Sequence, residues 1–156
     1  MKKIHDNFLR PPQQQLNNLI KYYQAGRYVD AEKLSLSITQ EFPKHQFAWK
    51  VLAVLLKRNG RISESLIVSK KSVQLDPQDA EAHNNLGVLL QEQGKLYEAE
   101  KSHRKAIELK PDYAEAHNNL GNTLKQQDKL DGAEKCYKKV ITLKPDYAKA
   151  HNNLGI

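Results

Sequence analysis

The sequence predicts an all-α fold, an α-solenoid in which antiparallel helix hairpins stack on one another. The first observation is the segment Ala-Glu-Ala-His-Asn-Asn-Leu-Gly, which occurs at 80–87 and again at 114–121. A third copy at 148–155 differs only in Lys149, which replaces the glutamate. The copies are 34 residues apart, a period typical of stacked helix pairs. The second observation is that apolar residues recur at spacings of three and four, as on a helix with one buried face.

The period divides the chain into a lead and a repeat domain. Residues 1–11 are a lead without a clear apolar pattern. The repeat domain covers 12–156, with repeats at 12–45, 46–79, 80–113 and 114–147 and a partial fifth at 148–156. We expect two helices in each complete repeat, with a proline after the second because proline cannot continue a helix. These prolines are Pro43, Pro77, Pro111 and Pro145.

The first two repeats differ most from the recurring segment. In the first, Leu16, Leu19 and Ile20 share one face of the expected first helix, which ends at a turn containing Gly26. In the second, the corresponding helix ends at Asn59-Gly60, a strong turn signal. Both repeats are therefore expected to form the same helix–turn–helix unit as the later ones.

The third and fourth repeats are identical at 22 of 34 aligned positions. The fourth has Asp128 where the others have a turn glycine, and Gly132 lies inside its second helix. Glycine in a helix interior costs about 1 kcal/mol relative to alanine. The hairpin at 114–147 is therefore predicted to be the least stable of the four.

These landmarks resemble those of the tetratricopeptide repeat. That family combines a bulky residue, a leucine and a small residue on the first helix with a turn glycine, a small residue on the second helix and a closing proline. In the third repeat these are His83, Leu86, Gly87, Gly94, Ala99 and Pro111. The resemblance covers about 12–156, and the first repeat departs from it with Asn18 and Leu19. It implies a right-handed superhelix whose first helices line a concave groove.

Composition narrows the possible environments and partners. The formal net charge of +7 permits an anionic partner but does not select one. Cys136 is the only cysteine, which excludes an intramolecular disulfide, and no apolar run approaches the length of a membrane span. No apolar run follows the first lysines, so no signal peptide is predicted. We expect a cytoplasmic protein.

No catalytic, cofactor or metal motif is found in the sequence, so we predict that the chain is not an enzyme, needs no cofactor and takes no small-molecule substrate. His83, His117 and His151 recur at the same place in successive repeats, which raises a metal hypothesis. Packed helix axes are about 8–10 Å apart, whereas zinc ligands lie about 2 Å from the metal. Packing inside each hairpin is the favoured interpretation.

The main functional signal is a series of asparagines on the first helices. Asn85, Asn119 and Asn153 share one place in the repeat, with Asn17 at that place in the first repeat, and Asn84, Asn118 and Asn152 precede the later three. A carboxamide both donates and accepts hydrogen bonds, so a row of them can pair with the backbone of an extended peptide. The series resembles the asparagine ladder of O-GlcNAc-transferase repeat domains. The alternative is that these asparagines are consensus residues that face water.

The resemblance also implies which other side chains line the groove. They change along the chain from apolar to basic to amide-rich, which would suit an extended peptide with an acidic segment. The residues expected to contact such a peptide are Leu16, Asn17, Ile20, Lys50, Lys57, Arg58, Asn84, Asn85, Asn118, Asn119, Asn122 and Asn153. The carboxylate clamp that holds chaperone C-termini is not matched, because Val54, Glu115 and Asn119 occupy three of its places.

The second helices carry dibasic pairs at one register: Lys70-Lys71, Arg104-Lys105 and Lys138-Lys139. Cations near a helix C-terminus complement its dipole, which explains them without a ligand. A nucleic-acid or membrane-surface adaptor is the disfavoured alternative, since aromatic residues for base stacking are sparse.

The last expectation concerns the partial fifth repeat. Ala150 and Leu154 are predicted to cover part of the open end of the stack and to mediate self-association as a homo-oligomer if that end stays exposed. The chain could also be the N-terminal part of a longer protein. We therefore predict a scaffold that binds an extended protein segment. The alternative is a substrate-presenting segment of a larger glycosyltransferase, sulfotransferase or methyltransferase.

Overall fold

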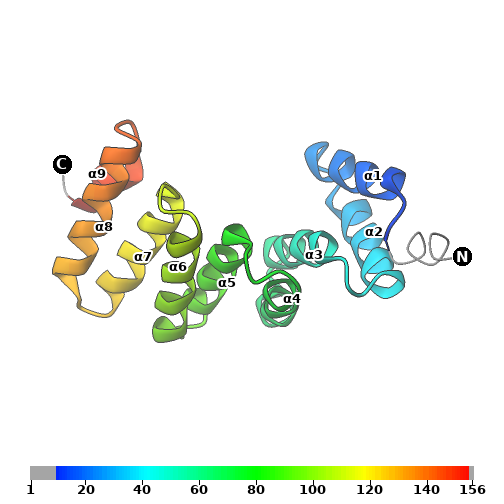
Figure 1. Cartoon of the computed structure of the whole chain (residues 1–156), viewed down its shortest axis with the longest axis horizontal. Helices are drawn as coiled ribbons and strands as arrows, with labels where there is room; N and C mark the ends of the chain where they lie inside the picture. The colour runs from blue at the N-terminus through cyan, green and yellow to red at the C-terminus, as the bar shows by residue number, and fades with distance from the viewer. Residues whose placement is uncertain (1–9, 155–156) are drawn as a thin grey trace, which may run out of the picture. The chain divides into compact units, whose positions relative to one another are not determined.

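The computed structural model describes residues 10–154 of the 156-residue chain, so most of the predicted lead lies outside the described residues. Within that range every regular element is an α-helix, which confirms the predicted all-α fold (Figure 1). The helices are α1 (Gln13–Gln24), α2 (Tyr28–Glu41), α3 (Gln46–Arg58), α4 (Ile62–Leu75), α5 (Ala80–Glu92), α6 (Leu96–Leu109), α7 (Ala114–Gln126), α8 (Leu130–Leu143) and α9 (Ala148–Leu154).

The helices belong to two compact units, residues 1–76 and 77–156, and each unit is described by itself. In the first unit α1 packs on α2, α2 on α3 and α3 on α4. In the second unit the same succession runs from α5 to α9, and α5 also contacts α7. Each unit is thus a stack of sequential hairpins, as expected for single hairpins that cannot bury their apolar faces alone.

The hairpin turns share one backbone conformation. Gly26, Gly60 and Gly94 have φ of 71°, 74° and 71°, the left-handed region that favours glycine. Asp128 takes the same place in the fourth hairpin with φ of 59°. The α7–α8 turn therefore keeps the geometry of the other turns at the steric cost of a side chain in that region.

The first unit is built around Leu19, which is fully buried. It packs with Ala31, Ile38, Phe42 and Leu55. The other repeats have alanine or glycine at the corresponding place on the first helix. The departure noted in the sequence therefore fills the core with a large side chain from α1.

In the second unit, large side chains of the second helices pack against glycines of the first helices. A Cβ on Gly87 would lie 2.6 Å from Cε1 of His103, and one on Gly121 would lie 2.5 Å from Cε1 of Tyr137. His103 is fully buried and Tyr137 is 2% exposed. Glycine is required at both places because any side chain would overlap these rings.

Each bulky residue in the fourth position of a repeat is anchored to the proline that closes the preceding repeat. Trp49 Nε1 donates to the Pro43 carbonyl at 3.0 Å. The histidines do the same through Nε2, with distances to the carbonyls of Pro77, Pro111 and Pro145 of 3.0, 2.9 and 2.6 Å for His83, His117 and His151. Because a carbonyl only accepts, each Nε2 carries the proton. These rings therefore have a structural role.

Candidate functional site

In the second unit a row of side-chain amides joins the first helices α5, α7 and α9. Asn119 Nδ2 donates to Asn84 Oδ1 at 3.1 Å, which links α7 to α5. Asn153 Nδ2 donates to Asn118 Oδ1 at 3.3 Å and to Asn122 Oδ1 at 3.0 Å, which links α9 to α7. We call these five asparagines the amide row. Five of the asparagines that the sequence singled out therefore connect successive repeats.

Two members of the amide row lie in the core. Asn84 is fully buried and Asn118 is 4% exposed, so neither presents a surface for a ligand. Adjacent residues on an α-helix point about 100° apart, so two consecutive asparagines cannot share one face. Asn84 Oδ1 also lies 3.1 Å from His103 Nδ1, which ties it to the second helix of its own hairpin. Asn84 and Asn118 were expected to contact a peptide on the groove surface, but both side chains are buried.

The remaining amides are half-buried and keep hydrogen-bonding capacity. Asn122 Oδ1 accepts from the Tyr137 hydroxyl at 2.9 Å as well as from Asn153. Among the described residues, Asn122 Nδ2 and Asn119 Oδ1 have no partner. The two residues are three apart on α7 and therefore neighbours on its surface. Together they offer one donor and one acceptor to a peptide group.

Other polar side chains extend this face of the second unit. Gln91 Nε2 of α5 donates to Gln126 Oε1 of α7 at 3.2 Å. Asn85 is half-buried, whereas Glu115 and Lys125 are exposed on α7. The face is therefore rich in amides and carries both signs of charge.

Tyr113, which immediately precedes α7, is half-buried. The pKa of Tyr113 is raised to about 12, mainly by burial and to a smaller extent by the charges of Glu115 and Glu81, against an opposing contribution from Asn84. Tyr113 therefore stays neutral at physiological pH and contributes no charge to the face.

The predicted groove residues of the first unit have mixed surroundings. Leu16 is half-buried and packs on the Leu19 core. Asn17 is exposed, and its Oδ1 accepts from Gln13 Nε2 at 3.0 Å. Ile20 is 40% exposed. Lys50 and Lys57 are half-buried and Arg58 is exposed.

Arg58 belongs to a set of contacts that the sequence did not predict. Its Cζ lies 3.9 Å from the centroid of the Tyr28 ring. The Tyr23 ring meets Tyr28 edge-on, with centroids 5.9 Å apart and an interplanar angle of 76°. Tyr23 is 39% exposed and lies three residues from Ile20 on α1. We call Ile20, Tyr23, Tyr28 and Arg58 the aromatic–arginine cluster.

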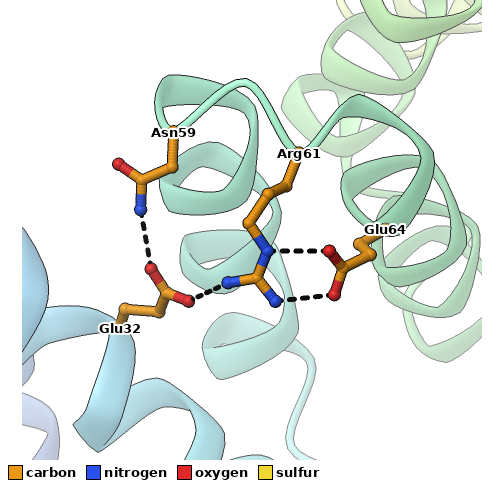
Figure 2. Close-up of polar contacts among 4 residues, drawn as sticks. All are labelled: Glu32, Asn59, Arg61 and Glu64. Atoms are coloured by element: carbon orange, nitrogen blue, oxygen red, sulfur yellow. Dashed lines mark hydrogen bonds and ion pairs between the residues drawn. The ribbon is translucent and has the colours of Figure 1, made fainter.

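A polar network flanks the turn between α3 and α4 (Figure 2). Glu32 on α2 accepts from Asn59 Nδ2 at 2.7 Å and from Arg61 Nη1, while Arg61 Nε and Nη2 donate to Glu64 at 2.7 and 2.6 Å. These bonds raise the pKa of Arg61, with the hydrogen bond to Glu64 as the largest cause, and the same bond lowers the pKa of Glu64. Through Glu32, the network connects the turn of the second hairpin to α2.

The second unit repeats this arrangement with other residues. Glu100 on α6 accepts from Lys129 Nζ at 2.8 Å and from Arg104 Nε at 2.9 Å. Burial raises the pKa of Glu100, but the hydrogen bonds from Lys129 and Arg104 outweigh it, so the pKa lies below the ordinary value. An acidic residue on one second helix thus pairs with a cation that begins the next.

The two residues expected to mediate self-association have different environments. Ala150 is fully buried and packs with Ala114 and Val140. Leu154 is half-buried against the cluster that contains Leu120 and Leu124. A self-association surface on α9 would therefore involve Leu154 and not Ala150, because Ala150 already belongs to the core.

Within residues 10–154 no group of three or more histidine, cysteine, aspartate or glutamate side chains is placed to hold a metal ion. Burial raises the pKa of the Cys136 thiol. No helix in the same range is long and apolar enough to cross a bilayer.

Sequential helix hairpins with glycine turns, and small residues set against large ones, define a helical-repeat protein. Models of the tetratricopeptide repeat family match residues 55–94 and 78–146, together more than half of the chain. The chain therefore belongs to the tetratricopeptide repeat family. No curated protein sequence matches it.

Solved structures agree with this assignment. The crystal structure of MamA is 25% identical, with a TM-score of 0.80 over 86% of this chain and 79% of that one. YrrB, described as a TPR protein with an unusual peptide-binding site, is 21% identical, with a TM-score of 0.81 over 91% and 73% of the two chains. The first TPR of Spaghetti (RPAP3), bound to an HSP90 peptide, is 24% identical, with a TM-score of 0.69 over 70% and 87%. The TM-scores establish that the fold is shared.

Proposed function

We propose that this chain is a non-enzymatic scaffold that binds an extended protein segment along its first helices. Tetratricopeptide domains mediate protein–protein interactions, and two structurally similar proteins, YrrB and RPAP3, are described with a peptide-binding site or a bound peptide. The observation that carries the proposal is that α7 presents an acceptor, Asn119 Oδ1, and a donor, Asn122 Nδ2, both without partners among the described residues.

These two groups are chemically complementary to a peptide backbone. An extended peptide presents an N–H donor and a C=O acceptor at each residue, so Asn119 Oδ1 could accept and Asn122 Nδ2 could donate. Exposed Glu115 and Lys125 would add preference for charged side chains of the ligand. The ligand differs from the HSP90 peptide of RPAP3 in this proposal, because Val54, Glu115 and Asn119 break the clamp pattern.

A displayed library of random dodecapeptides, selected on the full chain, tests this function. Selected peptides are then titrated calorimetrically against the wild type, Asn119→Ala and Lys101→Ala. Lys101 is exposed on α6 and serves as the matched control. We expect Asn119→Ala to weaken binding about three- to tenfold, the value of one hydrogen bond, and Lys101→Ala to leave it unchanged. Failure to select any peptide, or equal effects of the two variants, would contradict the proposal.

The fold alone leaves two alternatives as predictions. A substrate-presenting role in a larger transferase would use the same face, so an active transferase domain encoded downstream would support it. A nucleic-acid or membrane adaptor would use the dibasic pairs, and Lys138 of one such pair is already bonded to Glu134. Binding that disappears with added salt would be its signature.

A further inference from the structure

The net positive charge of the chain comes from its first unit. Residues 1–76 contain 13 Lys and Arg against 6 Asp and Glu, whereas residues 77–156 contain 12 against 12. The formal net charge of +7 therefore comes entirely from residues 1–76. An anionic partner would be steered toward this unit.

Three arginines flank the hairpin turns of the first unit, and two of them are neutralised. Arg27 pairs with Asp30 at 2.8 Å, and Arg61 pairs with Glu32 and Glu64. Both carboxylate oxygens of Glu32 are used, as Figure 2 shows.

Arg58 is the exception among these three arginines. Its guanidinium lies over the Tyr28 ring, and it has no carboxylate partner among the described residues. Stacking on the ring restricts the orientation of the planar guanidinium while leaving its N–H edge to solvent. A guanidinium held in this way is prepared to bind a carboxylate through two parallel hydrogen bonds.

Apolar surface lies next to this cation. Tyr23 touches Tyr28, and Ile20 is one helical turn from Tyr23, with 39% and 40% of Tyr23 and Ile20 exposed. Neither side chain is buried in the Leu19 core, so an incoming apolar side chain would gain contact area there.

We propose that the aromatic–arginine cluster binds a protein segment in which an apolar side chain adjoins an aspartate or glutamate. The carboxylate pairs with Arg58, and the apolar side chain covers Ile20 and Tyr23. This inference rests on the proposed peptide-binding function and specifies the class of partner. A protein is favoured over single-stranded nucleic acid because Arg58 and the Tyr23 edge already occupy Tyr28, whereas base stacking needs an open aromatic face.

The test uses the full chain and two sets of fluorescein-labelled dodecapeptides. In the first set each peptide has one Leu or Tyr next to two Asp or Glu residues. In the matched set Asn and Gln replace these acids. Fluorescence anisotropy gives Kd for the wild type, Arg58→Gln, Arg58→Lys and Lys70→Gln. Lys70→Gln removes the same charge from an exposed place on α4.

We expect the acidic set to bind at least about tenfold more tightly than the amide set, with Arg58→Gln losing this advantage. Arg58→Lys keeps the charge but not the planar fork, so a partial loss is expected. Lys70→Gln should bind as the wild type does. Circular dichroism of each variant confirms that the helices are intact.

Several outcomes would overturn the inference. Equal binding of the acidic and amide sets, or equal losses for Arg58→Gln and Lys70→Gln, would show that Arg58 does not select a carboxylate. If random-library peptides bind while the acidic set does not, this inference fails and the proposed function stands. If neither binds, both fail. Tighter, Arg58-dependent binding of a single-stranded oligonucleotide would assign the surface to nucleic acid.

Discussion

Tyr137 of α8 lies directly over Gly121 of α7, in space that a Cβ on Gly121 would have to share. The same relationship holds for His103 and Gly87 in the preceding hairpin. In the second repeat the corresponding residues are Ala53 and Ser69, both buried. A larger residue on the first helix is thus matched by a smaller one on the second, which keeps the space between the helices filled.

The first prediction tests this matching of sizes. Gly121→Ala should destabilise the chain by about 1–3 kcal/mol because the new methyl group overlaps Tyr137. Tyr137→Ser alone should cost about 3–5 kcal/mol through the cavity that it leaves. The double variant reproduces the Ala53–Ser69 pair, so we expect its loss in urea denaturation to be smaller than the sum. Strict additivity would show that the two residues do not interact.

The second prediction concerns pH. Burial lowers the pKa of His103 to about 4. Between the ordinary value of about 6.5 and pH 4 the unfolded chain therefore binds one more proton than the folded chain at this site. Stability should fall as pH decreases through this range, by about 3 kcal/mol in total for His103, and this contribution should level off below pH 4.

His103→Phe separates this effect from the titration of carboxylates. Phenylalanine retains a buried ring but has no titratable group, so the fall between pH 6.5 and 4 should be largely lost, whatever the absolute stability of the variant. Urea denaturation across this pH range is the measurement. An unchanged pH profile would mean that the pKa of His103 is the same in the folded and unfolded chains.

The third prediction addresses the α7–α8 turn. Asp128 has φ of 59°, a conformation in which a side chain costs about 1–2 kcal/mol and glycine does not. After the entropy loss of glycine is counted, Asp128→Gly should stabilise the chain by about 1 kcal/mol. Gly94→Asp is the reverse change in the preceding turn and should destabilise by a similar amount. Loss of stability in Asp128→Gly would indicate that the aspartate has a compensating role.

The fourth prediction compares two carboxylates that bind the same arginine. The Glu32 side chain is 14% exposed and that of Glu64 is 55% exposed. Exposed ion pairs contribute little, so Glu64→Gln should leave the urea midpoint almost unchanged. Glu32→Gln should cost about 1–2 kcal/mol because the charged acceptor that is lost is largely shielded from solvent. Equal losses in denaturation would show that burial does not strengthen the Glu32 pair.

The fifth prediction tests self-association through α9. We expect the mass measured by light scattering to rise with concentration and to return to that of a monomer in Leu154→Glu. Asn152→Glu, on an exposed residue of the same helix, is the control for added charge and should still associate. A wild-type mass that does not change with concentration would contradict this prediction.

The sequence by itself determined the repeat period, the all-α class and the place of each turn. These features depend on local chemistry, because glycine tolerates positive φ and proline ends a helix wherever the rest of the chain lies. The bonds of the recurring histidines to proline carbonyls were not foreseen.

Only the tertiary structure decided where the asparagine side chains and Arg58 lie and what they contact. Asn84 and Asn85 are the same residue type at adjacent positions, but Asn84 points into the core whereas Asn85 is half-buried. Asn119 contacts Asn84 across 35 residues of sequence. Arg58 of α3 contacts Tyr28 of α2, in the preceding repeat. Which side chains meet at that separation depends on how the hairpins pack, and a repeat pattern alone does not contain that information.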